Sequence, residues 1–545
     1  MGDTRVRRFG PAKRTTTALL AAGIGIVSPL AVVLPARAQT SDGGFYATPP
    51  PVDESALIPD TKQPDKTYTQ KKGCVERSTL GQNVVLNSRP WGQEYLQITK
   101  AQEIVRAASK DGSVGGGVKV AVIDTGVTRH PWFQNRLESG GEYVAKPSKG
   151  QPDGLEDCDG HGTEVAGIIA AKPEDPQVGF VGVAPDATIV SYRQLSENYA
   201  PDDKAQNGGG SSSSAPPTSG GTQQPPGSNT ALPPSTSNGG GEPGGGTVPG
   251  QNGGGRQLDK AGTAGTLTSL AMILRRIADD GSIGVVNMSV DRCRAADGTI
   301  QPLEKAVQAA VHYAAERNVV VVAAAGNSTD SCPQNDQADP LKPKTIVTPP
   351  WFADDVLSVG AIDDTGSVAS FSVHGPWVGV AAPGTKITSL DPAENSAGLA
   401  NLTFENGNQA TEIQGTSFAA PYVAGLAALV RAKYPNLRAR EVVARIKATA
   451  QHPAAPGGRD NFVGYGVIDP LAALTQVLPS DAGITAARPS PQWAQLPPAD
   501  DRNWTPMIVA LAGTGGGLVA LLITLFVMHT IRRNRPESSS ATKPR

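Results

Sequence analysis

The stretch VKVAVID, residues 118–124, is a short apolar run that ends at a turn. Four further runs of the same kind follow it: ATIVSYR (187–193), GVVNMSV (284–290), NVVVVAAAGN (318–327) and VLSVGAI (356–362). Short apolar runs of this kind are typical of strands that are buried on both faces, as in a parallel sheet. The sequence therefore predicts a sheet whose strands are contributed by well-separated parts of the chain.

Helical patterns separate these runs. TLTSLAMILRRIADD (266–280) and PLEKAVQAAVHYAAER (302–317) each repeat apolar residues at helical spacing, so that one face of each helix is apolar. Strands that alternate with helices predict an α/β fold, in which helices cover both faces of a parallel sheet.

The composition limits the class of partner and divides the chain. Of its 545 residues, 48 are Lys or Arg and 50 are Asp or Glu, so the net charge of −2 gives no reason to expect nucleic acid as a partner. The chain has 63 glycines and 46 prolines. Many of them lie in 201–257, a stretch with almost no large apolar side chain, which we expect to be a disordered surface loop within the domain.

Both ends of the chain carry membrane signals. Basic residues precede an apolar run at about 18–33, and Ala36-Arg37-Ala38 provides a cleavage site, so residues 1–38 are predicted to be a signal peptide. The alternative is a retained N-terminal helix. Residues 506–529 carry no Asp, Glu, Lys or Arg and would form a helix about 36 Å long, enough to cross a membrane. The basic tail 530–545 is predicted to be cytoplasmic, which places the rest of the chain on the periplasmic, extracytoplasmic side.

Between these signals the sequence predicts three parts. Residues 39–90 form a Pro-rich N-terminal extension, 91–475 form the α/β domain, and 476–505 form a Pro-rich linker to the membrane helix.

Four polar residues stand where strands end or helices begin. Asp124 closes the first run, His161 opens HGTEVAG, Asn327 closes AAAGN, and Ser417 lies in GTSFAAPYVAGLAALV, with Pro421 in the expected first turn of a helix. Taken singly, an Asp or Asn after a strand is usually a turn residue, and a Ser before a helix is usually an N-cap. Reactive groups gather at the carboxyl edge of a parallel sheet, however, and these four would meet there.

The segments AVIDTGV, HGTEVAG, AAAGN and GTSFAAP resemble motifs of the subtilisin-like serine proteases, and the resemblance extends over roughly 90–475. It implies that Ser417 is the nucleophile, that His161 is the general base and then the acid, and that Asp124 orients the imidazole. Asn327 and the backbone N–H of Ser417 would form the oxyanion hole. No G-x-S-x-G motif surrounds Ser417, which argues against an esterase or lipase.

The stretch EDCDGHG (156–162) also allows a second interpretation, in which Cys158 and His161 are half of a zinc site. A zinc site needs further Cys or His at matching spacing, and four cysteines in an exported chain more often form two disulfides. Cys293 and Cys332 lie just beyond two predicted strands and are candidate partners, which leaves Cys74 for Cys158. The other pairings stay open. We predict neither a metal site nor a cofactor.

The chain resembles the mycosins, which are membrane-anchored proteases of mycobacterial type VII (ESX) secretion systems. The resemblance lies in the order of its parts: a signal peptide, an extension joined to the domain by a disulfide, a subtilisin-like domain, a linker, a single membrane span and a basic tail. This resemblance implies a serine endopeptidase that acts on protein substrates beside a type VII membrane complex. The alternative is a mainly structural subunit of that complex, in which proteolysis is dispensable. Val290-Asp291-Arg292-Cys293 stands where many subtilisins have Leu-Gly-Gly, which indicates a narrow specificity.

Overall fold

The computed structural model describes residues 44–74, 77–79, 88–145, 154–202, 256–336, 339–393, 396–405, 409–479 and 505–533. The chain divides into two compact units between Gln476 and Val477. The predicted signal peptide, most of the predicted 201–257 loop, most of the linker and the end of the basic tail lie outside the described residues.

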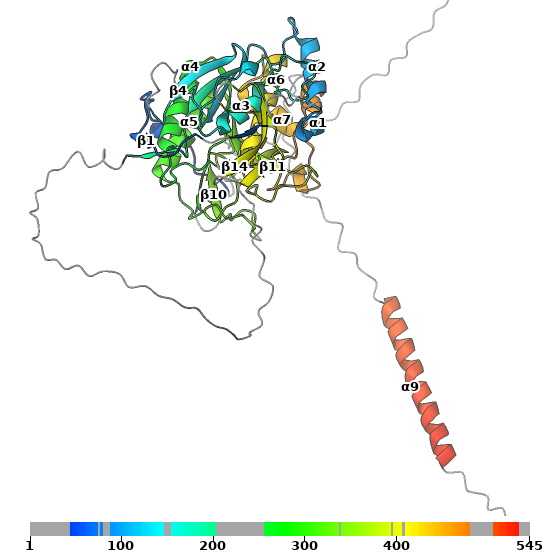
Figure 1. The fold of residues 1–545 in the computed structure, drawn as a ribbon. Helices are drawn as coiled ribbons and strands as arrows, with labels where there is room; N and C mark the ends of the chain where they lie inside the picture. The colour runs from blue at the N-terminus through cyan, green and yellow to red at the C-terminus, as the bar shows by residue number, and fades with distance from the viewer. Residues whose placement is uncertain are drawn as a thin grey trace, which may run out of the picture. The chain divides into compact units, whose positions relative to one another are not determined.

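The first unit contains a parallel sheet of seven strands in the described part of the chain, in the order β12-β11-β9-β7-β3-β5-β4. Figure 1 labels two of them, β4 and β11. Its strands are β3 (Lys119–Asp124), β4 (Leu137–Glu142), β5 (Thr188–Arg193), β7 (Ile283–Met288), β9 (Val320–Ala324), β11 (Val356–Ile362) and β12 (Val378–Pro383). Four of the five predicted runs contain one of these strands, and the run 284–290 overlaps β7, which begins one residue earlier. The α/β fold with a parallel sheet is confirmed.

Helices cover both faces of this sheet because its strands are apolar on both sides. In β3, Val120 and Val122 belong to one buried cluster, whereas Ala121 and Ile123 belong to the other. The first cluster includes residues of α2, α3 and α6, and the second includes residues of α4 and α5. The helices are α1 (Trp91–Tyr95), α2 (Ile98–Ala108), α3 (His161–Ala170), α4 (Leu267–Asp280), α5 (Pro302–Glu316), α6 (Thr416–Lys433), α7 (Ala439–Ala448) and α8 (Pro470–Thr475).

The ends of α4 and α5 follow from their sequences. Thr266 caps α4 by accepting a hydrogen bond from the backbone N–H of Ser269 at 3.1 Å, and Gly281 ends this helix in a left-handed conformation with φ +69°. Pro302 occupies the first turn of α5, where its missing N–H costs nothing.

Short antiparallel strands flank the main sheet. They are β1 (Tyr68–Gln70) with β6 (Tyr199–Pro201), β8 (Arg292–Ala295) with β10 (Thr345–Thr348), and a group of β2 (Arg77–Thr79), β13 (Ser389–Leu390), β14 (Leu399–Glu405) and β15 (Gln409–Glu412). Disulfide bonds join Cys74 to Cys158 and Cys293 to Cys332.

The stretch 44–74 packs along α4 and α5. Phe45, Leu57 and Ile58 contact the apolar cluster on that face, and Asp60 accepts a hydrogen bond from Tyr143 at 2.9 Å. Together with β1 and the Cys74–Cys158 bond, these contacts hold the stretch on the domain over much of its length.

The second unit contains α9 (Thr505–Arg533). Its stretch Val509–Arg533 has a mean hydropathy of 2.1 and is long and apolar enough to cross a membrane.

Candidate active site

The four predicted residues lie around the carboxyl ends of adjacent strands. Asp124 is the last residue of β3, and Asn327 lies three residues beyond β9. His161 is the first residue of α3, and Ser417 is the second residue of α6. All four are at most 5 % exposed.

Asp124 and His161 are joined directly. Asp124 Oδ1 lies 2.7 Å from His161 Nδ1, and the carboxylate is fully buried. The same oxygen accepts the backbone N–H of Thr125 at 2.7 Å. A carboxylate can only accept, so Nδ1 carries the proton and Nε2 is left with its lone pair available. This is the tautomer that a general base needs.

A second carboxylate, Asp157, fixes the start of α3 and thereby the position of His161. Asp157 Oδ1 accepts the backbone N–H of Gly160 at 2.7 Å, and Oδ2 accepts the N–H of Thr163 at 2.8 Å. It also accepts the hydroxyl of Thr125 at 2.8 Å, and this hydroxyl in turn accepts the N–H of Gly162 at 2.9 Å. The sequence interpretation missed this role of Asp157; an Asp a few residues before a helix start was the available signal.

Gly162 is required for close packing against the loop after β3. A Cβ atom at this position would lie 2.0 Å from the carbonyl oxygen of Gly126 and 3.1 Å from Cβ of Asp124. Helix α3 can therefore approach β3 closely enough for His161 to reach Asp124.

Ser417 differs from its predicted placement. Helix α6 begins at Thr416, so Pro421 lies inside the helix and not in its first turn. Because proline has no N–H, it leaves the carbonyl of the residue four positions earlier, Ser417, without its helical donor. The hydroxyl of Ser289 donates to that carbonyl at 2.8 Å. Pro421 thus leaves the Ser417 carbonyl available to Ser289, and this bond joins the residue after β7 to the start of α6.

The Ser417 hydroxyl does not reach the imidazole in this structure. Its Oγ donates to the carbonyl of Ser289 at 3.4 Å, and no hydrogen bond joins it to His161 within the described residues. The ring of the adjacent Phe418 lies 4.9 Å from the ring of His161, centroid to centroid, so the two segments do meet. Catalytic hydrogen bonds are often long or absent before substrate binds.

Asn327 is bonded to the residue before Ser417. Its Oδ1 accepts both the backbone N–H of Thr416 at 2.9 Å and the Thr416 hydroxyl at 3.0 Å. These two donors identify the oxygen of the amide, which leaves Nδ2 as a donor near Gly415. This geometry places an N–H donor beside the start of α6.

The thiol needed for a zinc site is not available. The sulfur of Cys158 is bonded to that of Cys74. In the part of the chain that the structure describes, no group of three or more His, Cys, Asp or Glu residues could hold a metal ion.

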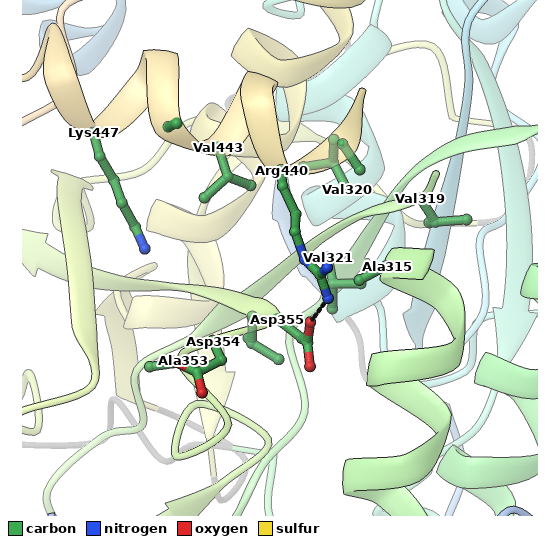
Figure 2. A pocket seen from close by; sticks show the side chains of 13 residues that line it. Ala315, Val319, Val320, Val321, Ala353, Asp354, Asp355, Arg440, Val443 and Lys447 are labelled. Atoms are coloured by element: carbon green, nitrogen blue, oxygen red, sulfur yellow. Dashed lines mark hydrogen bonds and ion pairs between the residues drawn. The ribbon is translucent and has the colours of Figure 1, made fainter. Parts of the chain in front are cut away.

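A hollow elsewhere on the first unit contains none of the four residues. It measures about 200 Å³ and lies between α5, β9 and α7 (Figure 2). Its walls are mainly valines and alanines, and at its rim Arg440 bonds to Asp355 at 2.6 Å. Burial lowers the pKa of Lys447, which lines the same hollow. We find no nucleophile and base paired there.

Comparisons with known proteins agree with this arrangement. Residues 115–466 match the family model described as the Subtilase family. Mycosin-1 of Mycobacterium tuberculosis is 38 % identical over 81 % of this chain and 85 % of its own length. The crystal structure of MycP1 from Mycobacterium smegmatis is 34 % identical, with a TM-score of 0.61, and covers 79 % of this chain and 96 % of its own.

One chain in the structure of an intact ESX-5 inner membrane complex is also similar. It is 34 % identical, with a TM-score of 0.62, and covers 89 % of this chain and all of its own length, 100 %. Together with the apolar helix α9, these matches identify a membrane-anchored protein. The chain belongs to the subtilase family of serine proteases and, within it, to the mycosins.

Proposed function

We propose that Asp124, His161 and Ser417 are the catalytic triad of this serine protease and that Asn327 stabilises the oxyanion. The observation that carries the proposal is the 2.7 Å bond between buried Asp124 and His161 Nδ1. It leaves Nε2 free to accept a proton, and Ser417 lies on the segment that contacts the imidazole.

In the first half-reaction the Ser417 hydroxyl rotates from the Ser289 carbonyl toward His161. Nε2 takes its proton as Oγ attacks the peptide carbonyl carbon, and His161 then gives that proton to the leaving amine. In the second half-reaction water replaces the amine and hydrolyses the acyl-enzyme. Asp124 stabilises the imidazolium in both halves.

Negative charge develops on the carbonyl oxygen of the substrate. Nδ2 of Asn327 and the backbone N–H of Ser417 are its donors, and the start of α6 adds the favourable end of a helix dipole. Because Oδ1 is held by Thr416, the amide is oriented before substrate arrives. A donor fixed in advance needs no reorganisation during the reaction.

We also propose that the chain works on the extracytoplasmic side of the membrane with a type VII secretion complex. In this proposal, 1–38 is a signal peptide, the extension stays attached through Cys74–Cys158, and the tail after α9 is cytoplasmic. The similarity to a chain of an ESX-5 inner membrane complex over 89 % of this chain supports that partner.

One pair of strains tests both proposals. Ser417→Ala should abolish cleavage of exported substrates, roughly a 10⁶-fold loss of turnover for a serine nucleophile, and leave the protein in the membrane complex. Deletion of the whole chain should impair the complex as well, measured by native electrophoresis of solubilised membranes. Full cleavage by Ser417→Ala would contradict the catalytic assignment, and an intact complex after deletion would contradict the partner.

A further inference from the structure

The backbone just after β7 offers an edge on which a peptide could pair. The carbonyl of Ser289 faces the Ser417 hydroxyl, which donates to it at 3.4 Å. In an extended chain, the backbone groups of residues two apart point to the same side. An extended backbone that continues from β7 to Asp291 would place the N–H and C=O of Asp291 on the side of Ser289 that faces Ser417. We call the backbone of 289–291 the peptide-binding edge, because extended peptides bind by adding a strand to such an edge.

The chain itself occupies this edge. The N–H of Asp291 donates to the carbonyl of Arg256 at 3.1 Å, and the N–H of Leu258 donates to the carbonyl of Asp291 at 2.6 Å. Gln257 thus pairs with Asp291 as a parallel bridge. Both backbone groups that Asp291 could offer to a peptide substrate are already used.

The side chain of Arg256 lies in an acidic environment. It is 15 % exposed, and its guanidinium lies 2.7 Å from Glu197 Oε2. Burial lowers the pKa of Arg256, but the charges of Glu197, Asp159 and Asp124 outweigh burial and raise this pKa above its ordinary value. The pKa of Glu197 is lowered mainly by Arg256, and His161 contributes to the same shift.

The position of Glu197 is fixed from the other side. Its backbone N–H donates to Asp159 Oδ1 at 2.8 Å, and Asp159 stands two residues before His161. The carboxylate that receives Arg256 is therefore carried by a segment tied to the loop that holds the imidazole.

We propose that Glu197 forms an acidic substrate subsite beside His161, suited to a Lys or Arg side chain, and that Arg256 and Gln257 occupy this subsite and the peptide-binding edge until a substrate displaces them. The inference rests on the proposed triad. A subsite of this kind would give the protease a preference for a basic residue on the acyl side of the cleaved bond. The chain's own Arg256 would compete with that residue for Glu197.

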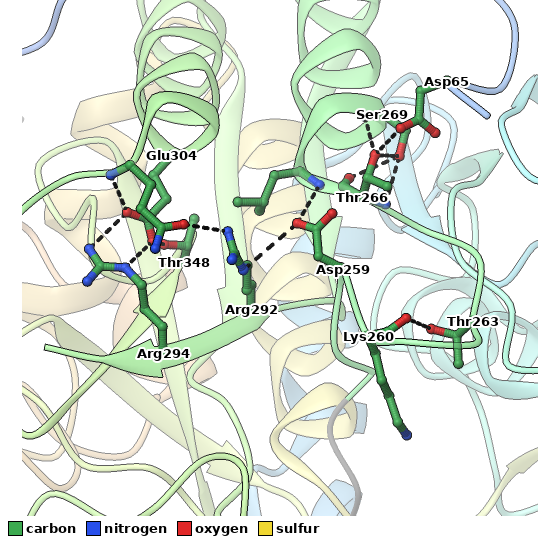
Figure 3. A network of polar contacts seen from close by, with 12 residues as sticks. Asp65, Asp259, Lys260, Thr263, Thr266, Ser269, Arg292, Arg294, Glu304 and Thr348 are labelled. Atoms are coloured by element: carbon green, nitrogen blue, oxygen red, sulfur yellow. Dashed lines mark hydrogen bonds and ion pairs between the residues drawn. The ribbon is translucent and has the colours of Figure 1, made fainter. Parts of the chain in front are cut away.

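The polar contacts of Arg256 and Gln257 can be exchanged for equivalent contacts with a peptide, whereas the side chain of Leu258 is 2 % exposed in the apolar cluster with α4 and α5 and stays there. Among the described residues, Arg256 and Gln257 are held by the ion pair with Glu197, the two backbone bonds to Asp291, and a hydroxyl of Ser331 at 3.4 Å from Gln257 Oε1. A basic peptide would replace the ion pair and the backbone bonds like for like. Of the next residues, Asp259 faces Arg292 at 3.9 Å (Figure 3). Lys260 also approaches Glu197, at 3.6 Å, through a more exposed side chain.

The test measures kcat/KM of the full chain in detergent. The substrates are fluorogenic tetrapeptides that carry Lys or norleucine, in turn, at each acyl-side position. The proteins are wild type, R256Q, E197Q and the double variant R256Q/E197Q. The control is K260Q, because Lys260 also approaches Glu197, at 3.6 Å, but its side chain is 55 % exposed. Active sites are first titrated with a fluorophosphonate, so that every rate is expressed per reactive Ser417, and thermal unfolding checks the fold.

At one of the acyl-side positions, we expect R256Q to raise kcat/KM about tenfold for the peptide with Lys. The increase for the peptide with norleucine at the same position should be much smaller. R256Q/E197Q should cleave the two peptides equally, and K260Q should change the ratio by less than about threefold. If R256Q does not fold, E197Q alone should lose the preference for Lys and cleave norleucine peptides faster than wild type.

An unchanged or lower kcat/KM in R256Q for every peptide, or a preference for Lys that persists in E197Q, would overturn the inference while Ser417 still titrates. If Ser417 titrates in no protein, wild type included, it is the proposed triad that fails.

Discussion

Asp124 and Asp291 are buried carboxylates at the ends of neighbouring strands, but their surroundings differ. Asp124 ends β3 and is 0 % exposed, and Asp291 lies three residues beyond β7 and is 1 % exposed. Asp124 receives the Thr125 N–H and His161 Nδ1 on one oxygen. Among the described residues, Oδ2 of both aspartates lacks a hydrogen-bond donor, so the two differ at Oδ1; burial raises the pKa of Asp291 to about 7.

The comparison separates two uses of a buried acid. At the end of β3 the carboxylate has a partner that becomes positive during the reaction, so its charge is used. After β7 the backbone of the aspartate is engaged by Arg256 and Leu258, while its side chain is buried and no cation of the described residues contributes to its pKa. Substitutions at the first site should change the rate, and those at the second should change stability.

The largest expected effect is that of Asp124→Asn. An amide at this position would no longer hold the imidazole in the required tautomer, and turnover should fall roughly 10⁴-fold. The measurement is kcat on a peptide substrate, with near-ultraviolet circular dichroism to verify the fold. A loss of less than about tenfold in a folded variant would mean that Asp124 only supports the loop.

Asn327→Ala extends the comparison to the end of a third strand, β9. Removing the side-chain donor should lower kcat by roughly 10²–10³, with little change in KM, because the donor acts on charge that develops in the transition state. Thr416 also loses its acceptor. Thr416→Val is therefore the control, because it removes only the hydroxyl and should cost much less than Asn327→Ala. Equal losses would assign the effect to packing.

Asp291→Asn should produce the smallest change in turnover, and instead change the pH dependence of stability. The carboxyl of the unfolded chain ionises near its ordinary pKa of 3.8, whereas the folded one stays protonated up to about pH 7. Between these values the folded state binds more protons, so the free energy of unfolding of the wild type falls as the pH rises.

The Asn variant lacks this titration. It should be more stable than wild type by about 2 kcal/mol at pH 8, after allowance for the cost of a buried amide. Because the shift in the pKa of Asp291 corresponds to about 4 kcal/mol, the difference should reverse near pH 4, where the wild type should be the more stable protein by about 2 kcal/mol. Denaturant unfolding at several pH values measures this, and parallel pH profiles for the two proteins would show that Asp291 does not titrate in this range.

The central strands and the two large helices could be predicted because burial on both faces requires continuous apolar runs and amphipathic spacing. The edge strand β4, with the sequence LESGGE, could not, since one side of an edge strand lacks a partner and its residues need not be apolar. The start of α6 was placed too late, because Pro421 is normally tolerated only in a first turn; here Ser289 supplies the missing donor to Ser417.

The candidate site could be predicted as four residue types at strand and helix ends, but not its supports. Asp157 and Ser289 act through backbone groups that are distant in sequence. Arg256 and Gln257 stood at the end of the predicted 201–257 loop, yet they pair with Asp291. A single backbone bridge leaves no periodic pattern, so only the three-dimensional structure reveals it.

Labelling of the full chain with a fluorophosphonate, followed by mapping of the modified peptide, tests whether Asp124, His161 and Ser417 act together. We expect one adduct, on Ser417, and its loss in Asp124→Asn and in His161→Ala. An adduct on another residue, or labelling of Ser417 at an unchanged rate without His161, would show that these side chains do not work as one site.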